Sequence, residues 1–210
     1  MDSNKNFSNA VVTTVRSGDL GGLSKDYAEI ALDSVLSEGL LRDLPIVKTL
    51  VAVGRIGLSI NNQIFAKKLI SFLCQLSELS PQVRAEMIDR LDKEEGFRQQ
   101  VGDRLIEILD RVDSHAKPEM LAKAFRAYAA GQIDGDMLNR LNNAIEKLPH
   151  YEIKAVRLFH SATVEERRDI AGTTLGALTA AGLTNLASGW DALIYEPNAV
   201  CNAFVAIGLG

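Results

Sequence analysis

The side chains in this sequence best suited to chemistry are three histidines and two cysteines: His115, His150, His160, Cys74 and Cys201. No histidine has a cysteine or a second histidine at the spacing of metal ligands, so the sequence predicts no metal site. The cysteines lie far apart in apolar surroundings (SFLCQL and NAVCNAF). This favours buried thiols in a reducing compartment, and we expect a cytoplasmic protein.

Other catalytic and ligand-binding motifs are also missing from the sequence. Asp134-Gly135-Asp136 resembles the start of a calcium loop, but its glycine is misplaced and the closing glutamate is absent, so we expect a turn and a helix cap. The chain has no Walker loop, no Gly-x-Ser-x-Gly turn and no nucleophile with a nearby base. The sequence therefore predicts no catalytic residue and no cofactor, and hence a protein that is not an enzyme.

The bulk composition is that of an ordinary globular protein. The 210 residues are 47% hydrophobic and 24% charged, with a net charge of −4 and a pI near 5.5. An acidic balance of this kind gives no general affinity for nucleic acid or for an anionic membrane surface. The first residues lack a basic stretch followed by an apolar run, so we expect no secretory signal.

Apolar residues recur at helical spacing along most of the chain, as in the stripe Phe97, Val101, Leu105, Ile108 and Val112. Strand-like alternation is absent before residue 183. The pattern predicts an all-α multi-helix bundle over residues 24–149, preceded by a flexible N-terminal arm over residues 1–23.

The segment from Arg84 to Asp113 is rich in both signs of charge, with nine acids and six bases. Pairs such as Glu94–Arg98 and Glu107–Arg111 have the order that supports a helix. We expect solvated helix faces here; a charged docking face is the alternative.

The most apolar stretch is Leu44 to Ile60, LPIVKTLVAVGRIGLSI, which has only two charges, Lys48 and Arg55. It is shorter than the roughly 20 apolar residues of a membrane span. We expect a helix buried in the bundle. The alternative is a helix that meets a membrane or a partner. In that interpretation the contact residues are those spread along the stretch: Leu44, Lys48, Leu50, Val53, Arg55 and Leu58.

Residues 150–210 have a different organisation from the bundle. The pattern predicts one helix around residues 153–159, a second from a capping box at Thr163 and Glu166 to about Gly182, a hairpin, and a final apolar helix. This order predicts a small C-terminal winged-helix-like unit that contains one β-hairpin.

Four residues of this unit are candidates for an interaction surface. Gly172 and Gly176 have the spacing that lets two helix backbones approach closely, either within the chain or with a partner. Trp190 and Tyr195 fall in the hairpin, where large amphipathic rings either anchor an interface or staple the hairpin to the bundle.

Charge argues against DNA binding by the winged-helix-like unit. Residues 164–210 contain two arginines and five acidic residues, a net charge of −3 (two minus five). A DNA-binding surface needs lysine and arginine to neutralise phosphates. We therefore expect no nucleic-acid partner.

The second half of the chain has a recognisable layout, in the segments AKAFRAYAAGQID, LNRLNNAIEKLPHYEIKAVRLF, LTAAGLTNL and YEPNAVCNAFVAIGL. Over about residues 120–210 it resembles the C-terminal part of bacterial abortive-infection alpha proteins and related uncharacterised helical families. The resemblance implies a bacterial protein tied to phage defence or a mobile element, and it implies no catalytic residue.

Two functional hypotheses follow from these patterns. The first is a non-enzymatic interaction or regulatory component of a phage-defence or toxin-type system, acting by protein–protein contact that includes self-association. The second is a membrane-active abortive-infection effector that inserts the apolar helix 44–60. An enzyme or nucleic-acid binder without a recognisable motif is a third alternative.

Overall fold

The computed structural model describes residues 2–18, 20, 44–52, 60–95, 97, 100–113, 116–188 and 193–210. Over these residues the chain is mostly helical, with one two-stranded hairpin near the C-terminal end, as the sequence predicts. The chain divides into two compact units, residues 1–122 and 123–210. The division falls between Ala122 and Lys123, earlier than the boundary after residue 149 that the sequence predicts.

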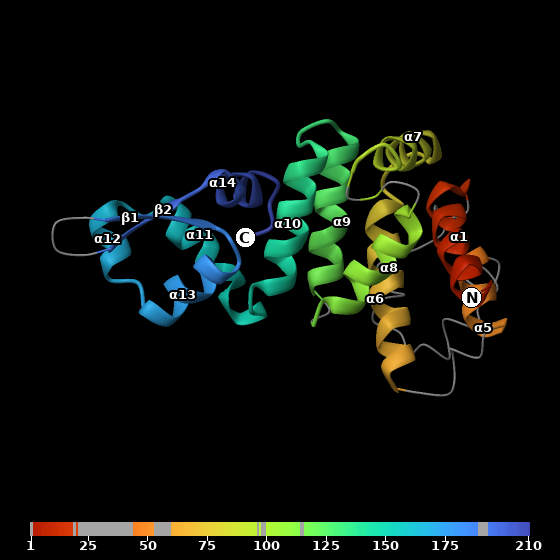
Figure 1. Cartoon of the computed structure of the whole chain (residues 1–210), viewed down its shortest axis with the longest axis horizontal. Helices are drawn as coiled ribbons and strands as arrows, with labels where there is room; N and C mark the ends of the chain where they lie inside the picture. Colours follow the sequence, from red (N-terminus) through yellow and green to blue (C-terminus); the bar gives the residue numbers. More distant parts are fainter. Residues whose placement is uncertain are drawn as a thin grey trace. The chain divides into compact units, whose positions relative to one another are not determined.

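The first unit consists of helices that pack around α1 and α8. Its elements are α1 (Asp2–Arg16), α5 (Pro45–Ala52), α6 (Ile60–Leu76), α7 (Pro81–Leu91), α8 (Val101–Arg111) and the start of α9 (Ala116–Ala129). Helix α1 contacts α5, α7 and α8, and α6 contacts α8 (Figure 1). Four residues of the predicted apolar stripe are buried, namely Phe97, Val101, Leu105 and Val112. Its fifth member, Ile108, is only partly buried, and the neighbouring Leu109 is the buried residue on that turn of α8.

Residues 2–16 form helix α1, whereas the sequence analysis assigned them to a flexible arm. Phe7, Val11 and Val15 recur every four residues and are at most 2% exposed. This apolar stripe buries enough surface to outweigh the low helix propensity of the neighbouring serine and asparagine residues.

The apolar stretch 44–60 contributes buried residues at its start, where the structure describes its side chains. Leu44 and Ile46 are each 1% exposed, and the Ile46 N–H donates a hydrogen bond to Thr14 Oγ1 at 3.0 Å. Lys48 is exposed. Helix α5 packs against α1 within the first unit.

The remainder of this stretch lies largely outside the described residues, which include neither the side chain of Leu50 nor Val53, Arg55 and Leu58. Helix α6 begins at Ile60, so Asn61 and Asn62 lie in its first turn. None of the described helices has both the length and the apolar character that a bilayer span requires.

Arg84 on α7 is 1% exposed, which corrects the expectation of a solvated face at this position. Its guanidinium donates hydrogen bonds to four backbone carbonyls, those of Val15 (2.8 Å), Ser17 (2.5 Å), Leu79 (2.5 Å) and Leu76 (3.5 Å). These carbonyls lie at the C-terminal ends of α1 and α6, where helices leave carbonyls unpaired and attract positive charge. Burial lowers the pKa of Arg84 from its ordinary value.

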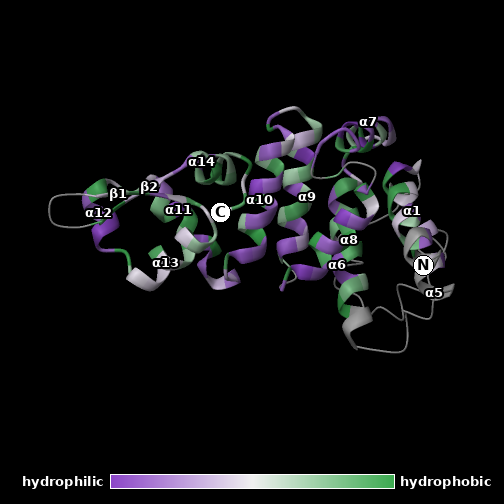
Figure 2. Cartoon of the chain, viewed as in Figure 1, coloured by the Kyte–Doolittle hydropathy of each residue, from purple (hydrophilic) through white to green (hydrophobic). Residues whose placement is uncertain are grey.

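The second unit has the winged-helix-like order of helices, hairpin and final helix. Its elements are the end of α9, α10 (Gly135–Lys147), η2 (His150–Glu152), α11 (Ile153–Ser161), α12 (Val164–Arg168), α13 (Gly172–Ala180), β1 (Thr184–Ser188), β2 (Leu193–Pro197) and α14 (Ala199–Ala206). The largely apolar α14 contacts α10, α11 and β2 (Figure 2). Val156, Phe159, Leu178 and Phe204 are fully buried and form the core of the unit.

The hairpin is antiparallel, and its register is given by the opposed pairs Leu186–Tyr195, Ala187–Ile194 and Ser188–Leu193. Because side chains alternate between the two faces of a strand, Leu186, Leu193 and Tyr195 lie on one face. We call these three residues the hairpin face.

The helix expected from Thr163 to about Gly182 is two helices in the structure. The capping box forms as predicted: the Glu166 N–H donates to Thr163 Oγ1, and the Thr163 N–H donates to the Glu166 carboxylate. Helix α12 then ends at Arg168, and α13 begins at Gly172 after an extended Ala171. Glycine disfavours a helix interior by about 1 kcal/mol relative to alanine, which weakens continuation through this point.

The Asp134-Gly135-Asp136 segment caps α10, but the capping residue is Asp134 and not Asp136, which the sequence predicts. Asp134 accepts a hydrogen bond from the Met137 N–H at 2.8 Å and is the N-cap. Asp136 lies in the first turn and pairs with Arg140 at 2.7 Å. Gly131, two residues after the end of α9, has a φ of +71°, a left-handed conformation that favours glycine.

Candidate functional site

The residue types most often used in metal and nucleophile chemistry form no cluster in the described structure. Among the described residues, no group of three or more histidine, cysteine, aspartate or glutamate side chains could hold a metal ion. His150 stacks edge-on against Tyr151, with ring centroids 5.6 Å apart. His115 lies outside the described residues.

Cys74 and Cys201 are free, buried thiols, as predicted. Burial raises the pKa of each from 9.0 to about 11; the Glu119 carboxylate adds to the rise at Cys74, whereas Arg167 opposes it at Cys201. A reactive cysteine needs a lowered pKa. Both thiols therefore stay protonated at neutral pH and act as core side chains.

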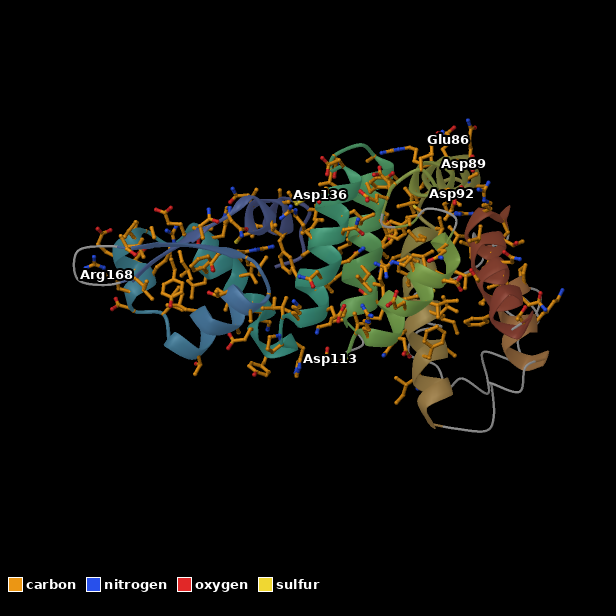
Figure 3. All side chains as sticks on the ribbon, in the orientation of Figure 1. Glu86, Asp89, Asp92, Asp113, Asp136 and Arg168 are labelled. Carbon is orange, nitrogen blue, oxygen red and sulfur yellow. The ribbon has the colours of Figure 1, made fainter. Side chains whose placement is uncertain are left out.

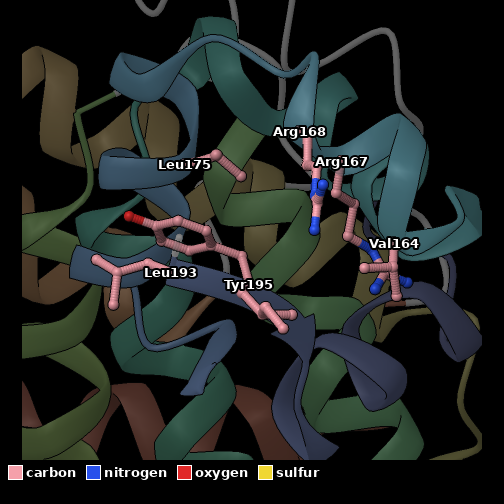
Figure 4. A pocket seen from close by; sticks show the side chains of 7 residues that line it. Val164, Arg167, Arg168, Leu175, Leu193 and Tyr195 are labelled. Carbon is pink, nitrogen blue, oxygen red and sulfur yellow. The ribbon is translucent and has the colours of Figure 1, made fainter. Parts of the chain in front are cut away.

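A pocket of about 250 Å³ opens in the second unit between α12, α13 and β2 (Figure 4). Its lining consists of two arginines and five apolar or aromatic residues, namely Arg167, Arg168, Val164, Leu175, Leu193, Ile194 and Tyr195. We call it the arginine pocket. Figure 4 shows both arginines on α12, with the Tyr195 ring between Leu175 and Leu193 in this view.

Arg167 is held in place by the core of its own unit. Its Nε donates to the Phe159 carbonyl at 3.1 Å, and its guanidinium carbon lies 5.4 Å from the centroid of the Phe159 ring. Phe159 is fully buried, so this contact ties α12 to α11. The arginine thereby presents a fixed positive charge at the pocket.

Arg168 is exposed and, within the part of the chain that the structure describes, has no hydrogen-bond or ion-pair partner (Figures 3 and 4). One nearby acid, Glu166, is engaged elsewhere. Glu166 completes the capping box, which lowers its pKa through the hydrogen bonds with Thr163. Arg168 is therefore available to an external anion.

A second pocket, of about 670 Å³, lies among α11, α12 and α13 and has acidic lining residues instead of basic ones. We call it the acidic pocket; its lining is Ala155, Leu158, Ser161, Ala162, Glu166, Asp169, Ile170, Ala171 and Thr174. Arg167 and Arg168 of α12 thus line one pocket, whereas Glu166 of the same helix and Asp169 at its C-cap line the other.

The hairpin face leaves apolar surface in solvent beside the arginine pocket. Leu186 is 53% exposed and Leu193 is 58% exposed, while Tyr195 is half-buried. Val164, across the pocket on α12, is 38% exposed. Trp190, the second predicted hairpin anchor, lies outside the described residues.

Gly172 and Gly176 are both exposed on α13, and a Cβ added at either would meet nothing within 4 Å. Close packing within the described chain therefore does not explain the Gly-x-x-x-Gly spacing. The opposite side of α13 carries the buried Leu175 and Leu178.

Comparisons of this sequence and structure with models of protein families, with curated proteins and with solved structures found no match.

Proposed function

We propose that this protein is a non-enzymatic interaction or regulatory component that acts by protein–protein contact through its second unit. The observation that supports the proposal is the hairpin face, where Leu186 and Leu193 are more than half exposed next to a pocket. Exposed apolar residues that are grouped and bordered by polar ones are typical of interaction surfaces.

The hairpin itself adds to this argument. Two strands alone are marginally stable in water, and they gain stability when a further element covers an apolar face. Here β1 is exposed along four of its five residues. A partner protein, or a second copy of this chain, would cover that surface.

The proposed setting is a bacterial phage-defence or toxin-type system in the cytoplasm. It is supported by the sequence resemblance over about residues 120–210. In that setting, loss of this chain from its native host should raise the plating efficiency of phage, and expression from a plasmid should lower it again.

The experiment that tests the contact compares association before and after the hairpin face is made polar. The test variant is Leu186→Ser combined with Leu193→Ser. The control is Tyr151→Ser, which removes a side chain that is 72% exposed on η2 and lines neither pocket. Light scattering reports self-association, and affinity purification from the native host reports partners.

We expect the wild-type and control proteins to associate and the hairpin-face variant to remain monomeric, with unchanged circular dichroism. A wild-type chain that is monomeric and captures no partner would end the proposal. Equal association by the hairpin-face variant would assign the contact to another surface.

A further inference from the structure

The arginine pocket combines properties that specify a ligand class. Of the described residues that line it, five are apolar or aromatic, two are arginines and none is acidic. An apolar side chain that enters would be removed from water, and a carboxylate beside it would meet uncompensated positive charge.

The volume of the arginine pocket limits what can occupy it. Pockets that bind drug-sized molecules and cofactors measure about 300–1,000 Å³, and this one measures about 250 Å³. It therefore suits one or two side chains of a longer segment better than a whole cofactor.

The charge of the second unit favours a protein over a nucleic acid as the source of the anion. Nucleic acid binds through many phosphate contacts, yet residues 164–210 have only two cationic side chains against five acidic ones. Those two cations both line the arginine pocket. A single carboxylate next to an apolar side chain matches this local charge, whereas a polyanion would be repelled by the remaining surface.

The two arginines have different roles in this recognition. Arg167 is fixed by the Phe159 carbonyl and ring, so it positions charge without having to be ordered by a ligand. Arg168 has no partner in the described structure and can form a two-pronged contact with a carboxylate, the geometry that arginine favours.

We infer that the arginine pocket binds an acidic segment of a partner protein, placing a leucine-, isoleucine- or phenylalanine-type side chain against Tyr195 and a neighbouring carboxylate on Arg168. The inference rests on the proposed function and identifies the chemistry of the partner.

The test is selection from a random linear peptide library displayed on phage, with the full chain as bait. We expect the enriched peptides to have aspartate or glutamate next to a large apolar residue. Synthetic copies of the enriched peptides should bind the wild-type chain and bind Arg168→Glu about tenfold more weakly, because the substitution replaces attraction with repulsion. Leu193→Ser should weaken binding in the same assay.

The matched control is Lys154→Glu, which makes the same change of charge at an exposed position on α11 that lines neither pocket. It should bind the peptides as the wild-type chain does. Circular dichroism on each variant shows whether it is folded, and Arg168→Gln replaces Arg168→Glu if the latter is not.

Four results would overturn the inference: no enriched peptide, enrichment without acidic residues, equal weakening by Lys154→Glu, or binding of duplex DNA or anionic vesicles that Arg168→Glu abolishes. None of these results decides the proposed function, because a protein contact could use the hairpin face without this pocket. A monomeric chain without partners would instead count against the proposed function.

Discussion

Replacing Arg84 by methionine should destabilise the first unit. Methionine keeps an unbranched apolar stem of comparable reach but removes the donors that satisfy carbonyls at the ends of α1 and α6. Hydrogen bonds to a charged donor contribute about 1.5–3 kcal/mol each, and three of those made by Arg84 are 2.8 Å or shorter. Their sum is therefore about 5–9 kcal/mol.

The cost of burying the guanidinium offsets part of that sum. Desolvation of a buried ion costs several kcal/mol, so the net loss is smaller than the hydrogen bonds alone indicate. We expect Arg84→Met to lower the free energy of unfolding by about 3 kcal/mol, or Tm by about 6–12 °C in a protein of this size. That is a large share of a typical stability of about 5–15 kcal/mol.

Urea denaturation followed by circular dichroism gives the free energy, and hydrogen exchange with mass spectrometry locates the effect. Exchange should accelerate in α1 and at the end of α6 and remain unchanged in α14, which belongs to the second unit. Arg90→Met is the control, because Arg90 is exposed on the same helix and its loss should cost less than about 1 kcal/mol.

Arg84→Lys separates charge from geometry. It keeps a positive charge, yet one ammonium cannot reach carbonyls that the planar guanidinium contacts on two helix ends, so most of the loss should remain. An Arg84→Met variant as stable as the wild-type protein would refute this reasoning, because desolvation would then equal everything the hydrogen bonds contribute.

Three further predictions concern packing and the thiols. Gly102→Ala should destabilise the protein, because the added Cβ would lie 2.3 Å from the Ser8 carbonyl oxygen. Gly176→Ala should stabilise it by about 1 kcal/mol, because a Cβ there meets open space. Urea denaturation measures both, and equal effects of the two variants would contradict this difference in packing. Asn142→Leu should raise Tm. Asn142 is 6% exposed, and its amide oxygen and nitrogen have no hydrogen-bond partner among the described residues, which costs about 1–3 kcal/mol. A lower Tm would mean that water satisfies the amide. The thiols of Cys74 and Cys201 should resist a disulfide reagent at neutral pH until urea is added. Because the folded pKa is raised from 9.0 to about 11, the unfolded chain ionises first, so stability should be full below pH 9 and fall as the pH rises towards 11 in a pH-dependent denaturation series.

Features that depend on nearby residues could be predicted from the sequence. The Thr163–Glu166 capping box needs only a short spacing of suitable side chains, and it forms as expected. The cap of α7 at Ser80, directly before Pro81, is equally local. The hairpin followed from a turn signal between two short apolar runs, and β1 and β2 confirm it. These patterns are local because each hydrogen bond joins residues a few positions apart.

The predictions that the structure corrects concern features that depend on residues distant in sequence. Arg84 and Arg90 lie on the same helix, and the helical spacing places only Arg84 on the face of the buried Met87, Ile88 and Leu91. That spacing does not show what satisfies a buried guanidinium: α1 and α6 bring their terminal carbonyls to Arg84, from residues up to 69 positions away. The spacing of Phe7, Val11 and Val15 is a local signal for the helix α1. The serine and asparagine residues around it are typical of a flexible segment, so composition alone predicts the wrong structure there.

The arginine pocket shows the same limit at the candidate site. Summed over residues 164–210, the charges of Arg167 and Arg168 are cancelled by five acids, and the sum argues only against DNA. In the structure these charges are separated in space: Arg167 and Arg168 line the arginine pocket, whereas Glu166 and the following Asp169 line the acidic pocket. A helix places residues about 100° apart around its axis, so four consecutive charges spread over opposite faces. Net charge therefore argues against a polyanion, and the arrangement on α12 supports the proposed contact with a single carboxylate.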